Sequence, residues 1–334
     1  MTSIRARLAI TMTAFVGLLA ASLLIAPLLG STPISLSRAF DGRLPYADNV
    51  DAQIFFVARL PRVLAAALVG GALAAAGVVF QALFRNPLAS PDTLGVSAGA
   101  ALGAVVAITF HLDFSIGGLS SVPLASLSGS LGALGIVYML ATARRGGMST
   151  TVLLLAGVTM TAFFSALIMF TQYLADDTDT FRMVRWLMGM LDVGGYAPLA
   201  ASIPFLLMAV GLCATLPRAL DLLSLGTDAA AARGVDVLRA ERAALVGASL
   251  ATGAAVSIAG PVGFVGIIVP HMVRRLVGSA HRLVLPASAL FGATFLITCD
   301  LMARTIFSPI EVPVGVVTAI IGGPFFLWLL LRRT

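Results

Sequence analysis

The chain has 334 residues, of which 59% are hydrophobic and only 11% are charged, and its formal net charge is +6. A soluble domain carries roughly 25% charged residues, so this composition excludes a soluble protein and leaves room for about ten membrane spans. Every basic residue is arginine, scattered singly or in pairs, which excludes a lysine-dependent P-loop nucleotide site and does not favour nucleic-acid binding.

Apolar runs in chain order predict the membrane spans. We expect them at 8–30, 54–84, 93–110, 122–143, 150–174, 196–216, 243–259, 262–273, 283–303 and 312–331. The eighth is short and is interrupted by Pro270. The sequence therefore predicts an all-α polytopic membrane protein of about ten transmembrane helices, with residues 1–334 as a single transmembrane domain.

The arginines predict the orientation. With a cytoplasmic N-terminus, twice as many arginines lie on the cytoplasmic side as outside, as the positive-inside rule requires. Both termini are then cytoplasmic. Arg59, Arg62 and Arg304 stand out, because they lie at the outer ends of helices where arginine is disfavoured.

Residues 59–103 hold two runs rich in small residues, joined by the polar, Pro-containing turn RNPLASP. Helices that pack closely in lipid need Gly, Ala and Ser at their contacts. We expect two membrane helices packed tightly together across a rigid turn, an arrangement that suits a gate or a docking point.

A weak internal repeat links the two halves of the chain. Residues 67–73, ALVGGAL, are similar to residues 244–250, ALVGASL, and the predicted topology runs the two copies in opposite directions. This predicts two five-helix halves related as an inverted repeat, a common plan among transporters.

The segment 217–242 is too polar to span a membrane. Its alanines and its breaks at Gly226 and Gly234 predict two short helices with a glycine hinge between them. Cys213 and Cys299 fall in separate apolar runs and are expected to be small core residues. The histidines have no clustered partners, so we expect no metal site.

Several blocks resemble the FecCD family, the permease subunits of type II ABC importers for iron chelates and vitamin B12. They are RLPR (59–62), QALFRNPLA (81–89), LGV (94–96), LLAGV (154–158), WLMG (186–189), LG (225–226) with Gly234, GPVGFVGIIVPH (260–271) and VPVGVVT (312–318). They cover nearly the whole chain in the expected order, although Arg85 stands where relatives can carry an acid.

The resemblance implies a subunit like the vitamin B12 importer permease in the bacterial inner membrane. It would pair with a second permease subunit, as a homodimer, around a central path. Two ABC ATPase subunits would carry the ATP and magnesium, and a periplasmic binding protein would deliver the cargo. No cofactor and no catalytic residue is expected in this chain.

The resemblance also implies roles for particular residues. Binding-protein docking falls on Arg59, Arg62 and Arg304, for which lipid-headgroup anchoring is the alternative. ATPase coupling falls on the 217–242 loop, at Leu225, Gly226, Asp228, Ala229, Ala230 and Gly234, which is otherwise a solvated loop. A cytoplasmic gate falls on Asn86, Leu88, Thr142, Ser149 and Thr150, which are otherwise ordinary helix-end residues.

Two other classes of function compete with this one. An ion-coupled secondary transporter needs ionisable groups deep in the membrane, and the span centres are almost free of them. We expect Asp300 and Glu311 to pair with Arg304 instead. A membrane enzyme needs paired carboxylates or clustered histidines, which the sequence does not offer. The cargo is expected to be an iron–siderophore first, then cobalamin, then haem.

Overall fold

A computed structural model describes residues 4–142 and 150–331, which are almost entirely helical. The α-helices are α1 (Ile4–Ile25), α2 (Leu36–Ala39), α3 (Val50–Gln53), α4 (Leu60–Leu83), α5 (Val96–Thr109), α6 (Ser121–Thr142), α7 (Thr150–Leu174), α8 (Asp177–Leu187), α9 (Ala197–Ala214), α10 (Pro217–Leu223), α11 (Thr227–Ala232), α12 (Val237–Ala259), α13 (Val265–Val277), α14 (His281–Thr305) and α15 (Val314–Leu331). Shorter turns are η1 (Ala26–Leu28), η2 (Tyr46–Asp48), the π-helical η3 (Ile54–Arg59) and η4 (Pro91–Leu94), and the strands β1 (Ser115–Ile116) and β2 (Leu119–Ser120) form a small hairpin.

Each predicted span overlaps one helix: α1, α4, α5, α6, α7, α9, α12, α13, α14 or α15. The helix of the eighth span, α13, has 13 residues and carries Arg274 and Arg275 in its last turn. Seven helices in the described ranges are long and apolar enough to cross a membrane, while α5 and α15 are shorter apolar helices. Two boundaries differ from expectation. α13 continues through Pro270, and α12 begins at Val237, so that the last residues of the predicted 217–242 loop are helical.

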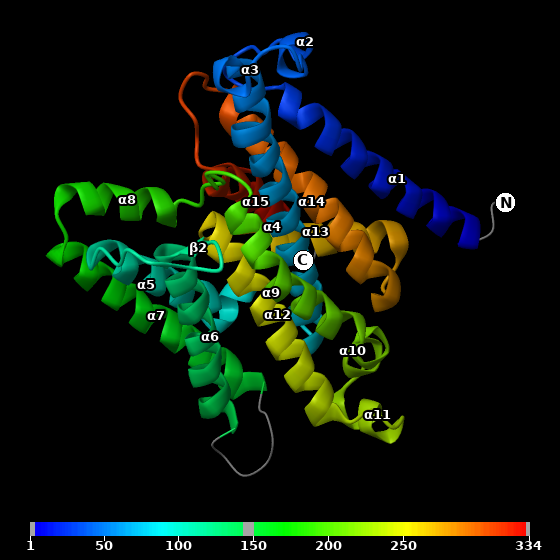
Figure 1. Cartoon of the computed structure of the whole chain (residues 1–334). Coiled ribbons are helices and arrows are strands. Elements are labelled where there is room, and N and C mark those ends of the chain that lie inside the picture. Colours follow the sequence, from blue (N-terminus) through cyan, green and yellow to red (C-terminus); the bar gives the residue numbers. More distant parts are fainter. Residues whose placement is uncertain (1–3, 143–149, 332–334) are drawn as a thin grey trace.

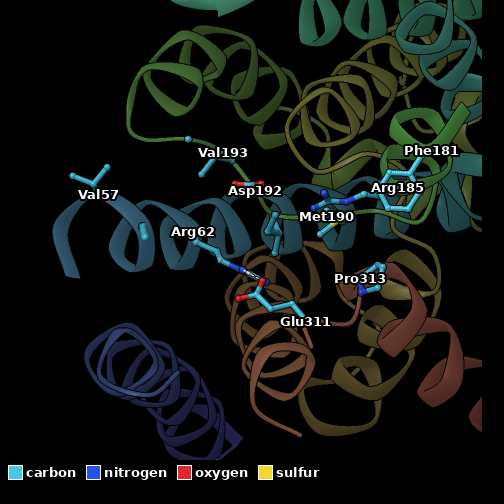
Figure 2. Close-up of a pocket in the computed structure, with 12 residues that line it drawn as sticks. Val57, Arg62, Phe181, Arg185, Met190, Asp192, Val193, Glu311 and Pro313 are labelled. Carbon is cyan, nitrogen blue, oxygen red and sulfur yellow. Dashed lines mark hydrogen bonds and ion pairs between the residues drawn. The ribbon is translucent and has the colours of Figure 1, made fainter. Parts of the chain in front are cut away.

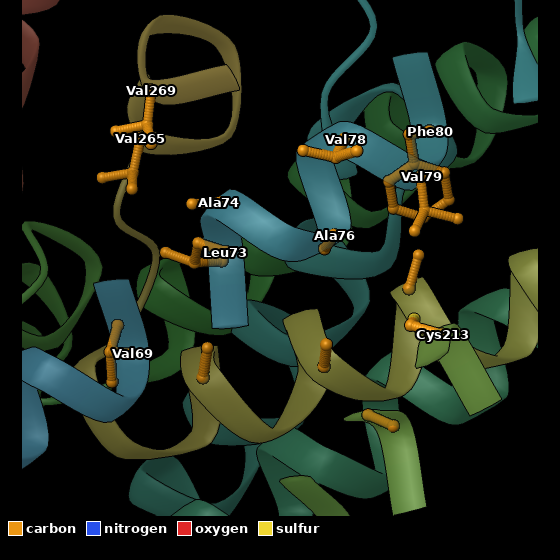
Figure 3. Close-up of a cluster of buried hydrophobic side chains, with 14 of the residues drawn as sticks. Val69, Leu73, Ala74, Ala76, Val78, Val79, Phe80, Cys213, Val265 and Val269 are labelled. Atoms are coloured by element: carbon orange, nitrogen blue, oxygen red, sulfur yellow. The ribbon is translucent and has the colours of Figure 1, made fainter. Parts of the chain in front are cut away.

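Helices α4 and α12 form the centre of the molecule (Figure 1). Within their most apolar windows, 67% of α4 and 83% of α12 is buried, against 6% of α1. The core around α4 combines alanine and valine with a few large side chains such as Phe80 (Figure 3). A central helix surrounded by other helices must be apolar on all sides, which explains why its sequence lacks a polar face.

Glycines set the close approach of these helices. A Cβ at Gly70 would collide with the backbone oxygen of Gly292 on α14, and one at Gly77 would collide with that of Gly266 on α13. The prediction of close packing is confirmed, but the predicted partner is wrong. α4 packs on α12, α13 and α14, whereas α5 packs on α6 and α7. Small residues specify a close contact without specifying which neighbour makes it.

The contacts between the two halves are those expected of an inverted repeat. α4 and α12, which carry the two similar segments, run in opposite directions and lie against each other (Figure 1). α4 packs on α13 and α14 from the second half, and α12 packs on α5 and α6 from the first half. Matching the five spans of each half in order pairs α4 with α12, α5 with α13 and α6 with α14. The contacts of α4 with α13 and α14 then correspond to those of α12 with α5 and α6.

The bundle has two distinct ends (Figure 1). The end that carries α2 and α3, with the loop that follows α14, is called the α2 end below. The opposite end, which carries α10 and α11, is called the α11 end. The polar segment 175–195, between two of the predicted spans, contains α8, which packs on α5 through the buried Met183.

Candidate functional site

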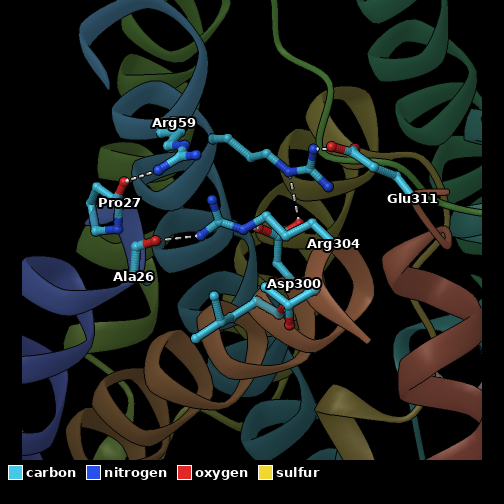
Figure 4. A network of polar contacts seen from close by, with 9 residues as sticks. Ala26, Pro27, Arg59, Asp300, Arg304 and Glu311 are labelled. Atoms are coloured by element: carbon cyan, nitrogen blue, oxygen red, sulfur yellow. Dashed lines mark hydrogen bonds and ion pairs between the residues drawn. The ribbon is translucent and has the colours of Figure 1, made fainter. Parts of the chain in front are cut away.

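A charged cluster joins α4 to α14 at the α2 end (Figure 4). Arg62 donates from Nε to Asp300 Oδ1 at 2.9 Å and from Nη1 to Glu311 Oε2 at 2.6 Å. Arg304, one helical turn beyond Asp300, places its Nε 3.4 Å from Asp300 Oδ2. The single buried carboxylate of Asp300 therefore lies between two guanidinium groups.

The other contacts of this cluster go to the end of the first helix. Arg59 donates to the backbone oxygens of Pro27 (3.3 Å), Leu28 (3.1 Å) and Thr32, and Arg304 donates to that of Ala26 at 2.7 Å. The last carbonyls of a helix have no partners within it, and cations are stabilised there. These two arginines thus attach the end of α1 to η3 and α14.

This geometry changes the expectation for docking. Arg59 is 6% exposed and Arg304 is 3% exposed, so neither presents its charge to a partner. Arg62, with a side chain 15% exposed, borders the surface. Glu311 pairs with Arg62 and not, as predicted, with Arg304. The exposed arginines in the segments beside this cluster are Arg38, Arg43, Arg182 and Arg185, which sequence reasoning did not select. Docking itself stays a prediction.

A cavity of about 720 Å³ opens beside Arg62 (Figure 2). Its walls come from η3, Arg62 of α4, α8, the segment 190–194 and the loop before α15. They mix apolar groups such as Phe181 and Met190 with charged ones. Arg185 and Asp192 bring opposite charges to the lining beside the Arg62–Glu311 pair. The cavity is wide, and its charges are balanced.

Three of the sequence blocks meet next to this cavity. Gly189 lies in the left-handed region at φ +74°, and a Cβ there would lie 2.6 Å from the backbone oxygen of Pro261. Gly315 donates its N–H to the oxygen of Gly189 at 3.3 Å, and a Cβ on Gly315 would collide with the oxygen of Met188. The glycine in each block is the sequence feature that could have predicted this contact, because only glycine allows backbones to approach each other this closely.

At the α11 end, the RNPLASP turn is held by its own backbone and by Asn86. The Asn86 side chain accepts from the N–H of Leu88 at 3.0 Å, and its backbone oxygen accepts from Ala89 at 3.0 Å. Asn86 is exposed and Leu88 is half-buried. This is the turn-stabilising use of asparagine.

The opposite side of the predicted gate is only partly described. Thr142 donates its hydroxyl to the backbone oxygen of Tyr138 at 2.9 Å, within α6. Thr150 begins α7, and Ser149 lies outside the described residues. The gate therefore stays a prediction.

The polar segment after α9 folds as expected into two short helices, α10 and α11, separated by Gly226 at φ +120° and ended by Gly234 at φ +79°. Leu225 is 64% exposed, Asp228 is exposed, and Ala229 is half-buried. Ala230, which was also predicted to take part in coupling, is fully buried against Leu223 and Ala240. One face of this segment thus packs against the rest of the protein, and the other face is exposed.

A polar connection joins this segment to the long helices. Asp221 on α10 accepts from the backbone N–H of His281 at 2.9 Å, and its Oδ1 lies 2.6 Å from His281 Nδ1. Arg274 on α13 donates to the side-chain oxygen of Gln81 on α4. The side-chain nitrogen of Gln81 donates in turn to the backbone oxygen of Gly266 at 3.1 Å. These side chains line a cavity of about 550 Å³ at the α11 end.

Candidate ligands for a metal ion are scattered. Cys213 and Cys299 are buried and unpaired. Within the described ranges, no three His, Cys, Asp or Glu residues come together as a metal site would require. The polar groups gather instead at the two ends of an apolar helical bundle.

This arrangement defines a polytopic α-helical membrane permease, with tightly packed central helices and distinct polar structures at its ends. The chain belongs to the FecCD transport family, whose model matches residues 18–332. The order and the pairing of the sequence blocks agree with that membership.

Named relatives span almost the same length. The chain is 40% identical to the hemin transport system permease of Yersinia pestis, with 82% of each chain covered. It is 41% identical to the cobalamin import system permease of Halobacterium salinarum, over 90% of this chain and 79% of the relative. It is also 41% identical to the Fe(3+) dicitrate transport system permease of Escherichia coli, over 82% of this chain and 84% of the relative.

The fold agrees with a solved structure. A transporter described as of the metal-chelate ABC type, in an inward-facing conformation, superposes with a TM-score of 0.82 at 34% identity. The superposition covers 96% of this chain and 98% of the other.

Proposed function

We propose that this chain is the transmembrane subunit of an ATP-binding cassette importer that forms the path for an iron chelate. Membership of the FecCD family carries this proposal. An iron–siderophore is the first candidate cargo, followed by cobalamin and haem. The names of the relatives include each of these classes of cargo, so the family by itself does not choose among them.

The energy would come from other chains. The sequence contains no lysine and hence no P-loop, so ATP and magnesium would be bound by two ATPase subunits. We place these at the α11 end, in the cytoplasm, with both termini on the same side. The exposed face of α10 and α11 supports this placement, because Leu225 and Asp228 are free to contact a partner.

The α2 end would then face a periplasmic binding protein. Arg62 is the residue of the predicted docking set best placed for it, at the rim of the 720 Å³ cavity. Arg59 and Arg304 would support docking indirectly, by holding the end of α1. The balanced charges of that cavity suit a path that lets a bulky chelate pass without retaining it.

The competing class, an ion-coupled transporter, finds no support in the charged cluster. Asp300 is 1% exposed and is paired with Arg62 and Arg304, as expected of a carboxylate that stabilises two arginines within the fold.

Reconstitution tests the proposal. The chain should co-purify with a cognate ATPase as a complex of two permeases and two ATPases, and vesicles containing it should import cargo only with ATP and the binding protein. Competition among iron–siderophore, cobalamin and haem identifies the cargo. ATP hydrolysis by the purified permease alone, or uptake driven by an ion gradient without ATP, would refute the proposal.

A further inference from the structure

An apolar groove of about 590 Å³ runs along one side of the bundle, between α9 and α14. Its floor is α4, with a contribution from α12, and α1 borders it through Leu19. The lining residues recur every three or four positions on α4, α9 and α14. Gly71, Val210 and Ala289 are examples from the three helices. The groove is narrow at its floor, because a Cβ on Gly71 would lie 3.2 Å from the backbone oxygen of Ala289.

The groove opens at the outer surface of the chain. Val210, which lines it, is 59% exposed, and the neighbouring Leu207 on α9 is 65% exposed. Apolar side chains this exposed on a membrane-spanning helix lie against hydrocarbon chains. The occupant of the groove should therefore come from the bilayer.

One end of the groove is charged. Among its described lining residues, Arg282 is the only one with an ionisable side chain that carries a charge at neutral pH. Arg282 is exposed, and it forms no ion pair with any residue in the described ranges. It is the second residue of α14, and Pro217 of α10 lines the same end of the groove. The charge thus lies at the α11 end.

The length of the groove matches a single leaflet. Its lining extends along α14 from Arg282 to Ala293. At a rise of about 1.5 Å per residue, this stretch measures about 16 Å. The hydrocarbon core of a bilayer is about 30 Å thick, so the groove spans about one half of it. An acyl chain in the groove would place its headgroup phosphate next to Arg282.

We propose that this groove is a binding site for one anionic phospholipid from the leaflet at the α11 end. The acyl chain fills the cleft between α9 and α14, and the headgroup pairs with Arg282. The proposal depends only on membrane embedding and on this geometry, so it stands or falls independently of the cargo and of the ATPase.

Native mass spectrometry of the full-length chain, released from nanodiscs of phosphatidylglycerol or of phosphatidylcholine, tests the site. We expect one retained phosphatidylglycerol per chain and much less phosphatidylcholine. Arg282→Glu should lower the retained phosphatidylglycerol at least about fivefold, the effect of one basic residue near an anionic surface. The matched control is Arg233→Glu, because Arg233 is also an exposed arginine at the α11 end but lies outside the groove.

A second pair of variants tests the acyl chain. Ala289→Phe fills the groove and should abolish retention, whereas Leu207→Phe, on the exposed face of α9 outside the groove, should not. A phosphatidylglycerol with a photoreactive acyl chain should label the lining helices α1, α4, α9, α12 or α14 of the unaltered protein, which keeps the proposal testable if Ala289→Phe does not fold. Equal retention of the two lipids, no retained lipid, labelling elsewhere, or cross-links to a second copy of the chain would each overturn it.

Discussion

Arginines lie at both ends of this permease, but the two ends use them differently. At the α2 end, Arg59 and Arg304 are buried and bound to backbone oxygens and to Asp300. At the α11 end, Arg233 and Arg282 are exposed, and the short helix α10 is tied to the long helices by Asp221. At the α2 end the arginines join helices inside the protein, whereas at the α11 end the α10–α11 segment packs through Leu220, Leu223 and Ala230 and leaves its arginine exposed.

The largest effect should come from breaking the charged cluster at the α2 end. Asp300→Asn removes the shared negative charge and leaves buried Arg304 without a counter-charge, which should cost about 3 kcal/mol. The midpoint of thermal unfolding in nanodiscs should fall clearly. Asp228→Asn, an exposed acid at the other end, is the control and should leave the midpoint unchanged. Equal midpoints for the two variants would mean that the cluster does not stabilise the fold.

A smaller and local effect is expected where Asp221 attaches α10 to the start of α14. Asp221→Ala removes the acceptor for the backbone N–H and the ring of His281, at a cost of about 2 kcal/mol. Amide hydrogen exchange should speed up in α10 and at the start of α14, with the α2 end unchanged. Asp221→Asn keeps an acceptor oxygen and should lose less. Exchange that rises evenly over the whole chain would contradict a local role.

A third change alters only the backbone of the segment 217–242, which is predicted to couple to the ATPase. Gly234 lies at φ +79°, and a Cβ there would meet no atom within 4 Å, so the cost of a side chain is conformational. Gly234→Val should cost about 1–2 kcal/mol locally and uncouple ATP hydrolysis from uptake. Asparagine tolerates this conformation, so Gly234→Asn should stay coupled. Normal transport by the valine variant would show that the segment is only a solvated loop.

The smallest effect concerns docking at the α2 end. Arg62→Gln leaves Asp300 paired with Arg304, so the fold should persist, while the binding-protein on-rate should fall a few-fold at low salt and less at high salt. Arg185→Gln, on the exposed face of α8, is the informative comparison. If only the second variant slows docking, the docking surface lies on α8 and the assignment of Arg62 is wrong.

Hydropathy and length suffice to recognise most of the helices at the ten predicted spans, although α13 has only 13 residues and carries two arginines in its last turn. The sequence also predicted the α10–α11 pair, since Gly226 and Gly234 mark its breaks directly. It missed α8, whose apolar contact with α5 through Met183 is too short to stand out between charged residues. The sequence predicted close packing of the segment 59–103, but it did not predict that α4 and α5 would pack on different neighbours.

What the sequence determined by itself was the class of protein, the approximate spans and the polar segments, because these follow from local composition. Only the tertiary structure decided that Arg59 and Arg304 face inward, that Glu311 pairs with Arg62, and that three glycine blocks meet beside the cavity at the α2 end. Each of these depends on residues far apart in the chain. In a bundle where most helices offer the same small apolar surface, the neighbours are chosen by the packing of the whole.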